Sequence, residues 1–187
     1  MRIISGSFKG KKILQPKDIK TRPLKDMTKE SIFNIITHSN KFKFFFNKSY
    51  ILDLFSGVGS FGLECLSRGA KKVVFIENYK GVLPILKQNL ISLKNISNYE
   101  IYENDIFKKN VLSKINYKYN LIFLDPPYKT QNVNYIFEQI KTHKVLDDNG
   151  IIILHRHKNE KDLVLEKVNI LEEKIYGVSK IFFVTLN

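Results

Sequence analysis

Between residues 50 and 155 the chain alternates short, almost wholly apolar runs with longer amphipathic segments. Apolar runs of about five residues are typical of strands buried on both faces, and the segments between them are typical of helices. Strands that alternate with helices at this spacing form a doubly wound parallel sheet. We therefore expect an α/β, Rossmann-like sheet, with strands at Tyr50–Phe55, Lys72–Glu77, Tyr99–Glu103, Asn120–Leu124 and Ile151–His155, and helices at Ser60–Ser67, Val82–Leu93, Ile106–Ile115 and Val133–Thr142.

The N-terminal part of the chain departs from this alternation. Residues 1–16 contain glycines between short apolar runs, a pattern that predicts a β-hairpin. The apolar stripe in residues 23–38 predicts a helix, with Thr28 as its candidate N-cap. We accordingly divide the chain into a basic N-terminal extension, residues 1–40, and an α/β domain, residues 41–187.

The C-terminal part departs from it as well. Two strand-like runs, Asn169–Tyr176 and Ser179–Leu186, flank Gly177 and predict an antiparallel hairpin. An aromatic run, Phe42–Phe46, precedes the first strand of the predicted sheet. Because burying large apolar side chains is the default, we expect these rings to cover the sheet beside the N-terminal helix and assign them no role in binding.

The 187-residue chain carries a net charge of +13, because 31 lysines and arginines stand against 18 acidic residues. Such a charge attracts polyanions, either nucleic acid or an anionic membrane surface. Most of the basic residues are lysines, which neutralise phosphate but read base edges poorly, so the charge favours docking on a nucleic-acid backbone. The sequence lacks a membrane-length apolar run and a secretory signal, and its histidines lack metal-ligand spacing. We expect a cytoplasmic protein with no membrane partner and no metal.

A glycine-rich turn, Gly57–Gly62, ends the first predicted strand. Glycines at this place let the chain turn sharply and let a ligand approach bare backbone, beside the N–H groups of the following helix. Glu77 ends the next strand, 20 residues after Gly57, where a carboxylate can accept hydrogen bonds from both hydroxyls of a ribose. These two features fit NAD and S-adenosylmethionine equally well, since both ligands carry an adenosine ribose.

Acidic residues stand at or just past the carboxyl ends of four strands, at the edge where open α/β sheets bind ligands. They are Asp53, Glu77, Asp105 and Asp125. Asp53 can pair with the amino group of a bound amino acid, which S-adenosylmethionine has, whereas the same carboxylate would repel a pyrophosphate. Asp105 can accept a hydrogen bond from the amino group of adenine. The acids therefore favour S-adenosylmethionine over NAD.

The motif Asp125-Pro126-Pro127-Tyr128 follows the buried run Leu121–Leu124. Its prolines force extended backbone and donate no hydrogen bonds, which leaves the Pro126 carbonyl free as an acceptor. Asp125 adds an ionised acceptor, and Tyr128 adds a flat ring. Two acceptors beside a stacking ring suit a planar base with an exocyclic amino group. They would aim its nitrogen at a methyl-sulfonium, so catalysis is mainly positioning.

Together these motifs resemble class I S-adenosylmethionine-dependent methyltransferases that act on exocyclic nitrogens, and more narrowly the RsmD-type rRNA guanine-N2 methyltransferases. The similarity extends over nearly the whole chain and is carried by Arg2–Gly6, Lys9–Lys12, Arg22–Pro23, Glu30–Asn34, Asp53–Gly59, Gly62–Ala70 and Asp125–Tyr128. The resemblance implies one class I domain with an N-terminal extension that contacts RNA. It also implies S-adenosylmethionine as cofactor and, as substrate, one guanine of 16S rRNA (position 966 in the usual rRNA numbering) in an assembled or nearly assembled small subunit.

From the motifs and the resemblance we expect a monomer with three groups of functional residues. Cofactor binding is expected of Asp53, Phe55, Ser56, Gly57, Gly59, Glu77, Asn78, Asp105 and Ile106. Methyl transfer is expected of Asp125, Pro126 and Tyr128, and contact with RNA phosphates is expected of Arg2, Lys9, Lys11, Lys12 and Arg22.

The chain departs from the family pattern at two places. Leu24 stands where a hydroxyl residue is usual, and His155-Arg156-His157 stands where a more acidic run is usual. We carry no family role to either. His155 and His157 would share a strand face, and we expect them to contact phosphate or solvent at the rim.

Three other functions compete with this prediction. A DNA adenine-N6 methyltransferase shares Asp125–Tyr128 but commonly brings a target-recognition domain, for which 187 residues leave little room. An RNA-binding assembly factor would keep the basic surface and a vestigial cofactor pocket. An NAD dehydrogenase would need a site for hydride transfer, which the motifs do not supply.

Overall fold

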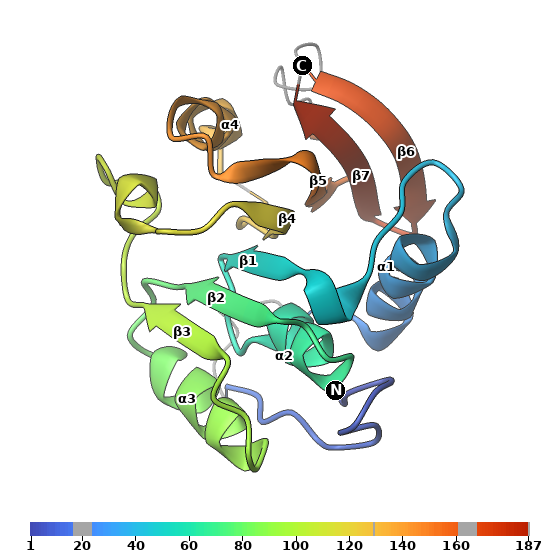
Figure 1. Cartoon of the computed structure of the whole chain (residues 1–187), viewed down its shortest axis with the longest axis vertical. Helices are drawn as coiled ribbons and strands as arrows, with labels where there is room; N and C mark the ends of the chain where they lie inside the picture. The colour runs from blue at the N-terminus through green and yellow to red at the C-terminus, as the bar shows by residue number, and fades with distance from the viewer. Residues whose placement is uncertain (17–23, 129, 161–167, 187) are drawn as a thin grey trace.

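The computed structural model describes residues 1–16, 24–128, 130–160 and 168–186. Within these ranges the strands form one mixed sheet in the order β3-β2-β1-β4-β5-β7-β6 (Figure 1). The strands are β1 (Tyr50–Leu54), β2 (Lys72–Ile76), β3 (Tyr99–Tyr102), β4 (Tyr119–Leu124), β5 (Leu146–His157), β6 (Val168–Tyr176) and β7 (Ser179–Leu186). The helices are α1 (Asp26–His38), α2 (Ser60–Ser67), α3 (Leu83–Ser92) and α4 (Val133–Thr142), with 3-10 turns η1 (Phe46–Lys48) and η2 (Leu112–Lys114).

The order of the strands reverses at β1, which pairs in parallel with β2 on one side and with β4 on the other. β5 continues the parallel half beside β4, whereas β7 runs antiparallel to both β5 and β6. The predicted doubly wound sheet and its C-terminal antiparallel hairpin are thus confirmed. Ligands of open α/β sheets bind where the strand order reverses, beyond the carboxyl ends of the strands. In this chain that point lies between β1 and β4.

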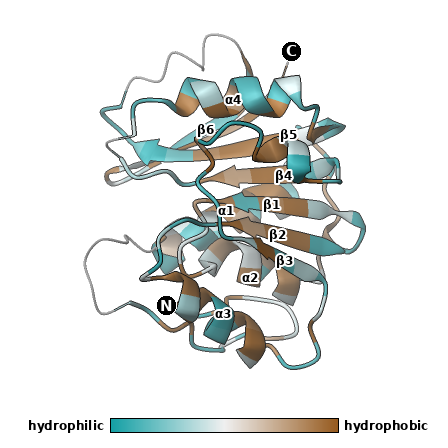
Figure 2. Ribbon diagram, turned by 90° about the vertical axis from the view of Figure 1, so that its left-hand side faces the viewer, coloured by the Kyte–Doolittle hydropathy of each residue, from teal (hydrophilic) through white to brown (hydrophobic). Residues whose placement is uncertain are grey.

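Helices cover both faces of the sheet: α1, α2 and α3 lie on one side and α4 on the other (Figure 1). Alternate residues of a strand point to opposite faces. Ile51 and Phe123 accordingly pack in the core beneath α1–α3, and Leu52 and Ile122 pack in the core beneath α4. Figure 2 shows the hydrophobic strands between these layers. A sheet covered on both faces explains why its strands are near-continuous apolar runs. Every helix in the described ranges is too short or too polar to cross a bilayer.

The N-terminal segment, residues 1–16, is held against α2 by a buried carboxylate. One oxygen of Glu64 accepts a hydrogen bond from the Ile4 amide at 2.7 Å, and the other accepts from Ser5 at 2.9 Å and from Arg68 Nε at 2.9 Å. Gly6 lies so close to α2 that a Cβ on it would be 1.9 Å from the Ser67 carbonyl oxygen. The predicted hairpin forms in an irregular way: an isolated antiparallel bridge joins Arg2 and Lys12, and backbone hydrogen bonds run from Ile3 N to Lys11 O, from Gly10 N to Ile3 O and from Ile13 N to Met1 O.

Replacing Glu64 with alanine should therefore destabilise the fold and release residues 1–16. Removing one partner from a buried charged network costs about 3–5 kcal/mol, because the groups left behind have no acceptor. Denaturant unfolding would measure the loss, and faster tryptic cleavage after Lys9 and Lys11 would show the release. Glu103→Ala removes an exposed carboxylate that pairs with Lys87 on the surface and serves as the control. Equal stability of both variants would contradict this account of the segment.

Two local predictions are wrong. No α-helix forms over Ile106–Ile115: only η2 is helical there, and Asn110 has a left-handed φ of 62°, which interrupts any longer helix. Thr28 is not an N-cap, because α1 already begins at Asp26 and Thr28 is buried within its first turns.

The prediction for the aromatic run is confirmed at alternate positions. Phe42 stacks on Phe183 of β7, and Phe46 stacks on Phe33 of α1, with ring centroids 6.0 and 5.9 Å apart. Phe45 points away and is 60% exposed. The covering rings tie α1 to the sheet next to the point where the strand order reverses.

Candidate active site

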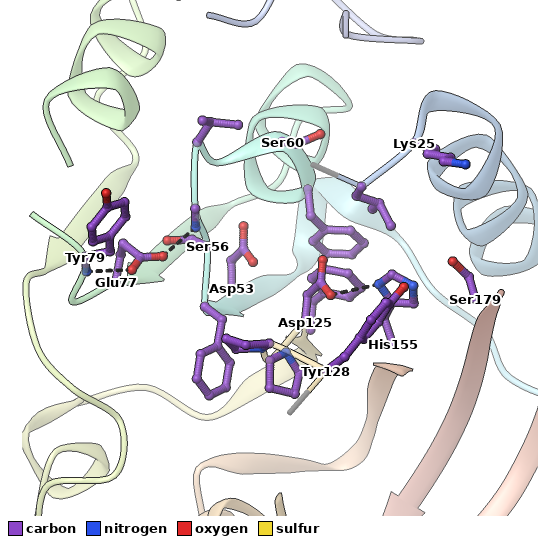
Figure 3. A pocket seen from close by; sticks show the side chains of 18 of the residues that line it. Lys25, Asp53, Ser56, Ser60, Glu77, Tyr79, Asp125, Tyr128, His155 and Ser179 are labelled. Atoms are coloured by element: carbon purple, nitrogen blue, oxygen red, sulfur yellow. Dashed lines mark hydrogen bonds and ion pairs between the residues drawn. The ribbon is translucent and has the colours of Figure 1, made fainter. Parts of the chain in front are cut away.

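A cavity of about 670 Å³ opens at the carboxyl ends of β1, β2, β4 and β5, where the strand order reverses (Figure 3). Three further parts of the chain complete it: the residues before α1, the first residues of α2, and the first residue of β7. Its lining consists of Leu24, Lys25, Asp53, Phe55, Ser56, Gly57, Val58, Ser60, Phe61, Glu77, Asn78, Tyr79, Phe123, Asp125, Pro126, Pro127, Tyr128, His155 and Ser179. Most of the residues predicted from the sequence for cofactor and base therefore meet in one cavity.

Glu77 is held in one orientation by backbone amides. One carboxylate oxygen accepts from Gly57 N at 2.7 Å, and the other accepts from Asn78 N and Tyr79 N at 2.9 and 2.8 Å. Three of the about four acceptor sites of the carboxylate are thus filled, and one site, on the oxygen bonded to Gly57, is left for a ligand in the cavity. A Cβ on Gly57 would meet nothing closer than the Phe55 carbonyl oxygen at 4.0 Å, so bare backbone borders open space there.

Asp53 is a buried acid without a cation. Its side chain accepts a hydrogen bond from the Gly62 amide at 2.9 Å, and the residue is 1% exposed. Burial raises the pKa of this carboxyl well above its usual range, and the nearby charges of Asp125 and Glu77 raise it further. No ion pair to it is seen among the described residues. Asp53 is therefore suited to receive a positively charged group from a ligand.

The opposite wall of the cavity is formed by the Asp125–Tyr128 motif after β4. One Asp125 oxygen lies 2.8 Å from His155 Nδ1, and the Asp125 side chain is 20% exposed toward the cavity. The Tyr128 ring stands edge-on to His155 and His157, at centroid distances of 5.9 and 5.2 Å. In Figure 3 Asp125 and Tyr128 face the cavity from the side opposite Glu77. The motif thus places a carboxylate and an aromatic ring across from the residues expected to hold a cofactor.

The expectation that His155 lies at a solvated rim is wrong. β5 runs on to His157, so His155 sits inside the sheet opposite Ile181 of β7 and is only 6% exposed. The sequence analysis also did not anticipate Lys25, Tyr79 or Ser179 in the cavity. Tyr79 follows Glu77 beyond β2, whereas Lys25 and Ser179 come from the start of α1 and of β7, to which the strand-end rule that found the acids does not apply.

Several predicted residues lie outside the cavity lining. Asp105 accepts a hydrogen bond from the Phe107 amide at 3.0 Å, and its neighbour Ile106 is buried. Gly59 shapes the glycine-rich turn and lies outside the cavity lining. Its φ is +83°, and a Cβ there would be 2.5 Å from the Leu86 side chain.

The basic residues predicted to contact RNA lie on the N-terminal segment. Arg2, Lys9 and Lys12 are exposed and Lys11 is half-buried. Arg2 and Lys9 border a second hollow, between this segment and α1. Arg22 lies outside the described residues.

The comparisons with known proteins agree with this geometry. Residues 1–185 match the family model described as conserved hypothetical protein 95. The chain belongs to this family. Ribosomal RNA small subunit methyltransferase D of Haemophilus influenzae is 31% identical over 183 residues, which span 95% of this chain and 90% of that protein. A Bacillus subtilis protein named among the rRNA methyltransferases, YlbH, is 35% identical over 164 residues, 87% of this chain and 85% of that protein.

A solved structure supports the same assignment. The Escherichia coli protein YhhF, assigned as a methyltransferase, aligns over 100% of this chain and 98% of its own with a TM-score of 0.80 and 25% identity. The family is the RsmD-type group of class I S-adenosylmethionine-dependent methyltransferases, so the resemblance inferred from the motifs is confirmed. The donor set fits that cofactor: Asp53 offers a buried carboxyl for its amino group, and Glu77 offers a carboxylate of fixed orientation for its ribose.

Proposed function

We propose that this protein transfers a methyl group from S-adenosylmethionine to the exocyclic N2 of a guanine in 16S rRNA, of the position 966 type, in the small ribosomal subunit or a late assembly intermediate. The proposal is carried by one observation: a single cavity joins Asp53 and Glu77 to the acceptor wall of Asp125, Pro126 and Tyr128. The protein would act as a cytoplasmic monomer.

The cofactor half of the cavity would be organised around three groups. Asp53 pairs with the amino group of the methionine moiety, backbone at Gly57 approaches its carboxylate, and Glu77 accepts from the ribose hydroxyls. Phe55, Ser56 and Asn78 complete this half, and Asp105 with Ile106, farther along the same edge, receives the adenine. When bound, the cofactor supplies an electrophilic methyl group on a sulfonium.

The acceptor half would hold the guanine. Asp125 and the Pro126 carbonyl take the two hydrogens of the N2 amino group, which turns the nitrogen lone pair toward the methyl carbon. The new N–C bond forms as the S–C bond breaks, and the nitrogen then gives up a proton, for which the Asp125 carboxylate is the acceptor at hand. A flipped base costs a few kcal/mol, and stacking on Tyr128 returns about 1–3 kcal/mol. Because these terms nearly cancel, affinity must come from contacts elsewhere.

Those contacts would be made by the N-terminal segment. Changing Lys9, Lys11 and Lys12 together to glutamine should weaken binding of small subunits and lower the slope of log affinity against log salt by about two to three. Binding measured between about 50 and 200 mM salt would show it. The matched control changes Lys108, Lys109 and Lys114, exposed around η2 on the other side of the sheet. A slope that is equally reduced in the control would remove the specific docking role of the segment.

The proposed function is tested by incubating the protein with tritiated S-adenosylmethionine and small subunits from cells that lack it, and then mapping the nucleosides by mass. Label in N2-methylguanosine at one site of 16S rRNA is expected. Label in DNA adenine would favour the DNA methyltransferase instead. Tight binding of small subunits without any transfer would favour an assembly factor.

A further inference from the structure

Strand β5 ends directly beneath the acceptor motif, and its last residues contact that motif from both faces of the sheet. His155 and His157 make edge-on contacts with the Tyr128 ring, whereas Arg156, between them, donates to the carbonyls of Pro127 and Thr130 on either side of Tyr128. These three residues therefore support the acceptor motif from the neighbouring strand.

The contact between His155 and Asp125 fixes both partners. An ionised carboxylate can only accept, so the 2.8 Å bond requires the hydrogen of His155 on Nδ1. In the neutral ring Nε2 then carries a lone pair; it is buried and has no hydrogen-bond partner among the described residues. The ring cannot relay a proton from Asp125, because the nitrogen facing Asp125 already bears one. The bond from His155 engages one oxygen of Asp125. Because it fixes the orientation of the whole carboxylate, it also sets the direction of the other oxygen.

Arg156 holds the segment that carries Tyr128. It is 1% exposed, and its guanidinium donates to the Pro127 carbonyl at 3.3 Å and to the Thr130 carbonyl at 2.9 Å. The Thr130 amide in turn donates to Pro127 O at 2.8 Å, which closes a tight turn. A planar guanidinium can bridge two carbonyls at once, whereas a lysine ammonium acts as a point charge. Arg156 thus fixes the turn and, with it, the position of the Tyr128 ring.

We propose that His155 and Arg156 are positioning residues of the methyl-acceptor site: His155 aims the Asp125 carboxylate at the amino group of the base, and Arg156 fixes the turn that presents Tyr128. The inference rests on the proposed function, in which Asp125 and Tyr128 hold the guanine. In this proposal neither residue acts by contact with the substrate, although His155 borders the cavity. Both act by holding groups within the small tolerance that positioning catalysis requires, since a displacement of about 1 Å can cost about a hundredfold in rate.

The main test compares His155→Leu with His155→Asn. Leucine removes the donor, and asparagine returns an N–H close to the position of Nδ1. We expect kcat to fall about 10- to 100-fold in the leucine variant and to stay within about threefold of the wild-type value in the asparagine variant. The KM for S-adenosylmethionine should stay within about twofold of the wild-type value in both. His143→Leu, which removes a half-buried histidine of α4's end bonded to Gln139, is the matched control and should keep full kcat. Equal loss in the leucine and asparagine variants, or no loss in either, overturns the role of His155.

A second measurement begins with the wild-type protein, so its first result does not depend on how any variant folds. In the wild-type protein the ¹⁵N spectrum of His155 at about pH 8 should report the Nδ1–H tautomer, and Asp125→Ala should shift it toward the Nε2–H tautomer that free histidine prefers. A wild-type ring protonated on Nε2 alone contradicts the geometry.

The role of Arg156 is tested by Arg156→Lys. This variant keeps the positive charge but loses the bridge between the two carbonyls, and we expect a fall of about tenfold in kcat. Unchanged kcat in Arg156→Lys overturns the role of Arg156. Failure of the wild-type protein to methylate small subunits would instead remove the proposed function itself.

Discussion

Replacing Asp125 with alanine should lower methyl transfer to small subunits by about a hundred- to a thousandfold while S-adenosylmethionine still binds. The reason lies in the division of the cavity. Asp125 stands on the acceptor wall, and the groups expected to hold the cofactor, Asp53 and Glu77, have their own hydrogen bonds to Gly62 and to Gly57. Losing one preorganised acceptor at the reacting atom costs about this much in enzymes whose catalysis is electrostatic positioning.

Single-turnover transfer of tritium would measure the chemical step, and calorimetry would measure cofactor affinity in the same preparation. Asp148→Ala removes a carboxylate whose side chain is 91% exposed and paired only weakly, with Lys118 at 3.4 Å, and provides the control. Transfer in Asp125→Ala near the wild-type rate would take Asp125 out of the mechanism. Loss of cofactor binding in that variant would show that the two halves of the cavity are not independent.

The sequence was sufficient for the sheet and for the acids along its edge. Buried parallel strands are continuous apolar runs. A carboxylate near the carboxyl end of such a run, like Asp53, or just after it, like Asp125, is carried to one edge by the regular geometry of the strands. These positions depend only on local pattern and on the rule that parallel strands end together.

The residues that the sequence did not reveal are brought in by long-range packing. His155 was expected at a solvated rim, but pairing of β5 with β7 continues to His157 and buries it against Asp125. Lys25 and Ser179 reach the cavity from α1 and β7, elements whose docking on the sheet is not encoded in any short motif. The prediction of a helix after β3 failed for a local reason and not because of long-range packing. The apolar residues of this segment have helical spacing, but Asn110 adopts a left-handed φ.

Replacing Asp53 with asparagine should stabilise the free protein and weaken binding of S-adenosylmethionine. Burial raises the pKa of this carboxyl in the folded state, so the folded chain holds the proton more tightly than the unfolded one. Stability from this group is therefore fully present below the unfolded pKa of about 3.9 and is lost as the pH rises through the folded value. Asparagine keeps an oxygen for the Gly62 amide and carries no charge, which removes this loss.

The same substitution removes the anion that the amino group of the cofactor would meet. An ion pair broken at a buried site costs about 3–5 kcal/mol, equivalent to an affinity loss of a hundredfold or more. We expect calorimetry to show that loss and urea unfolding at about pH 8 to show a more stable variant, with the difference in stability narrowing toward about pH 5. A variant that is less stable at both pH values, or that binds the cofactor as tightly as the wild type, would contradict this account. In it, the charge of Asp53 destabilises the free protein and is stabilised by the bound cofactor. Opposite changes in stability and affinity would show that the fold tolerates this buried acid because the cofactor needs it.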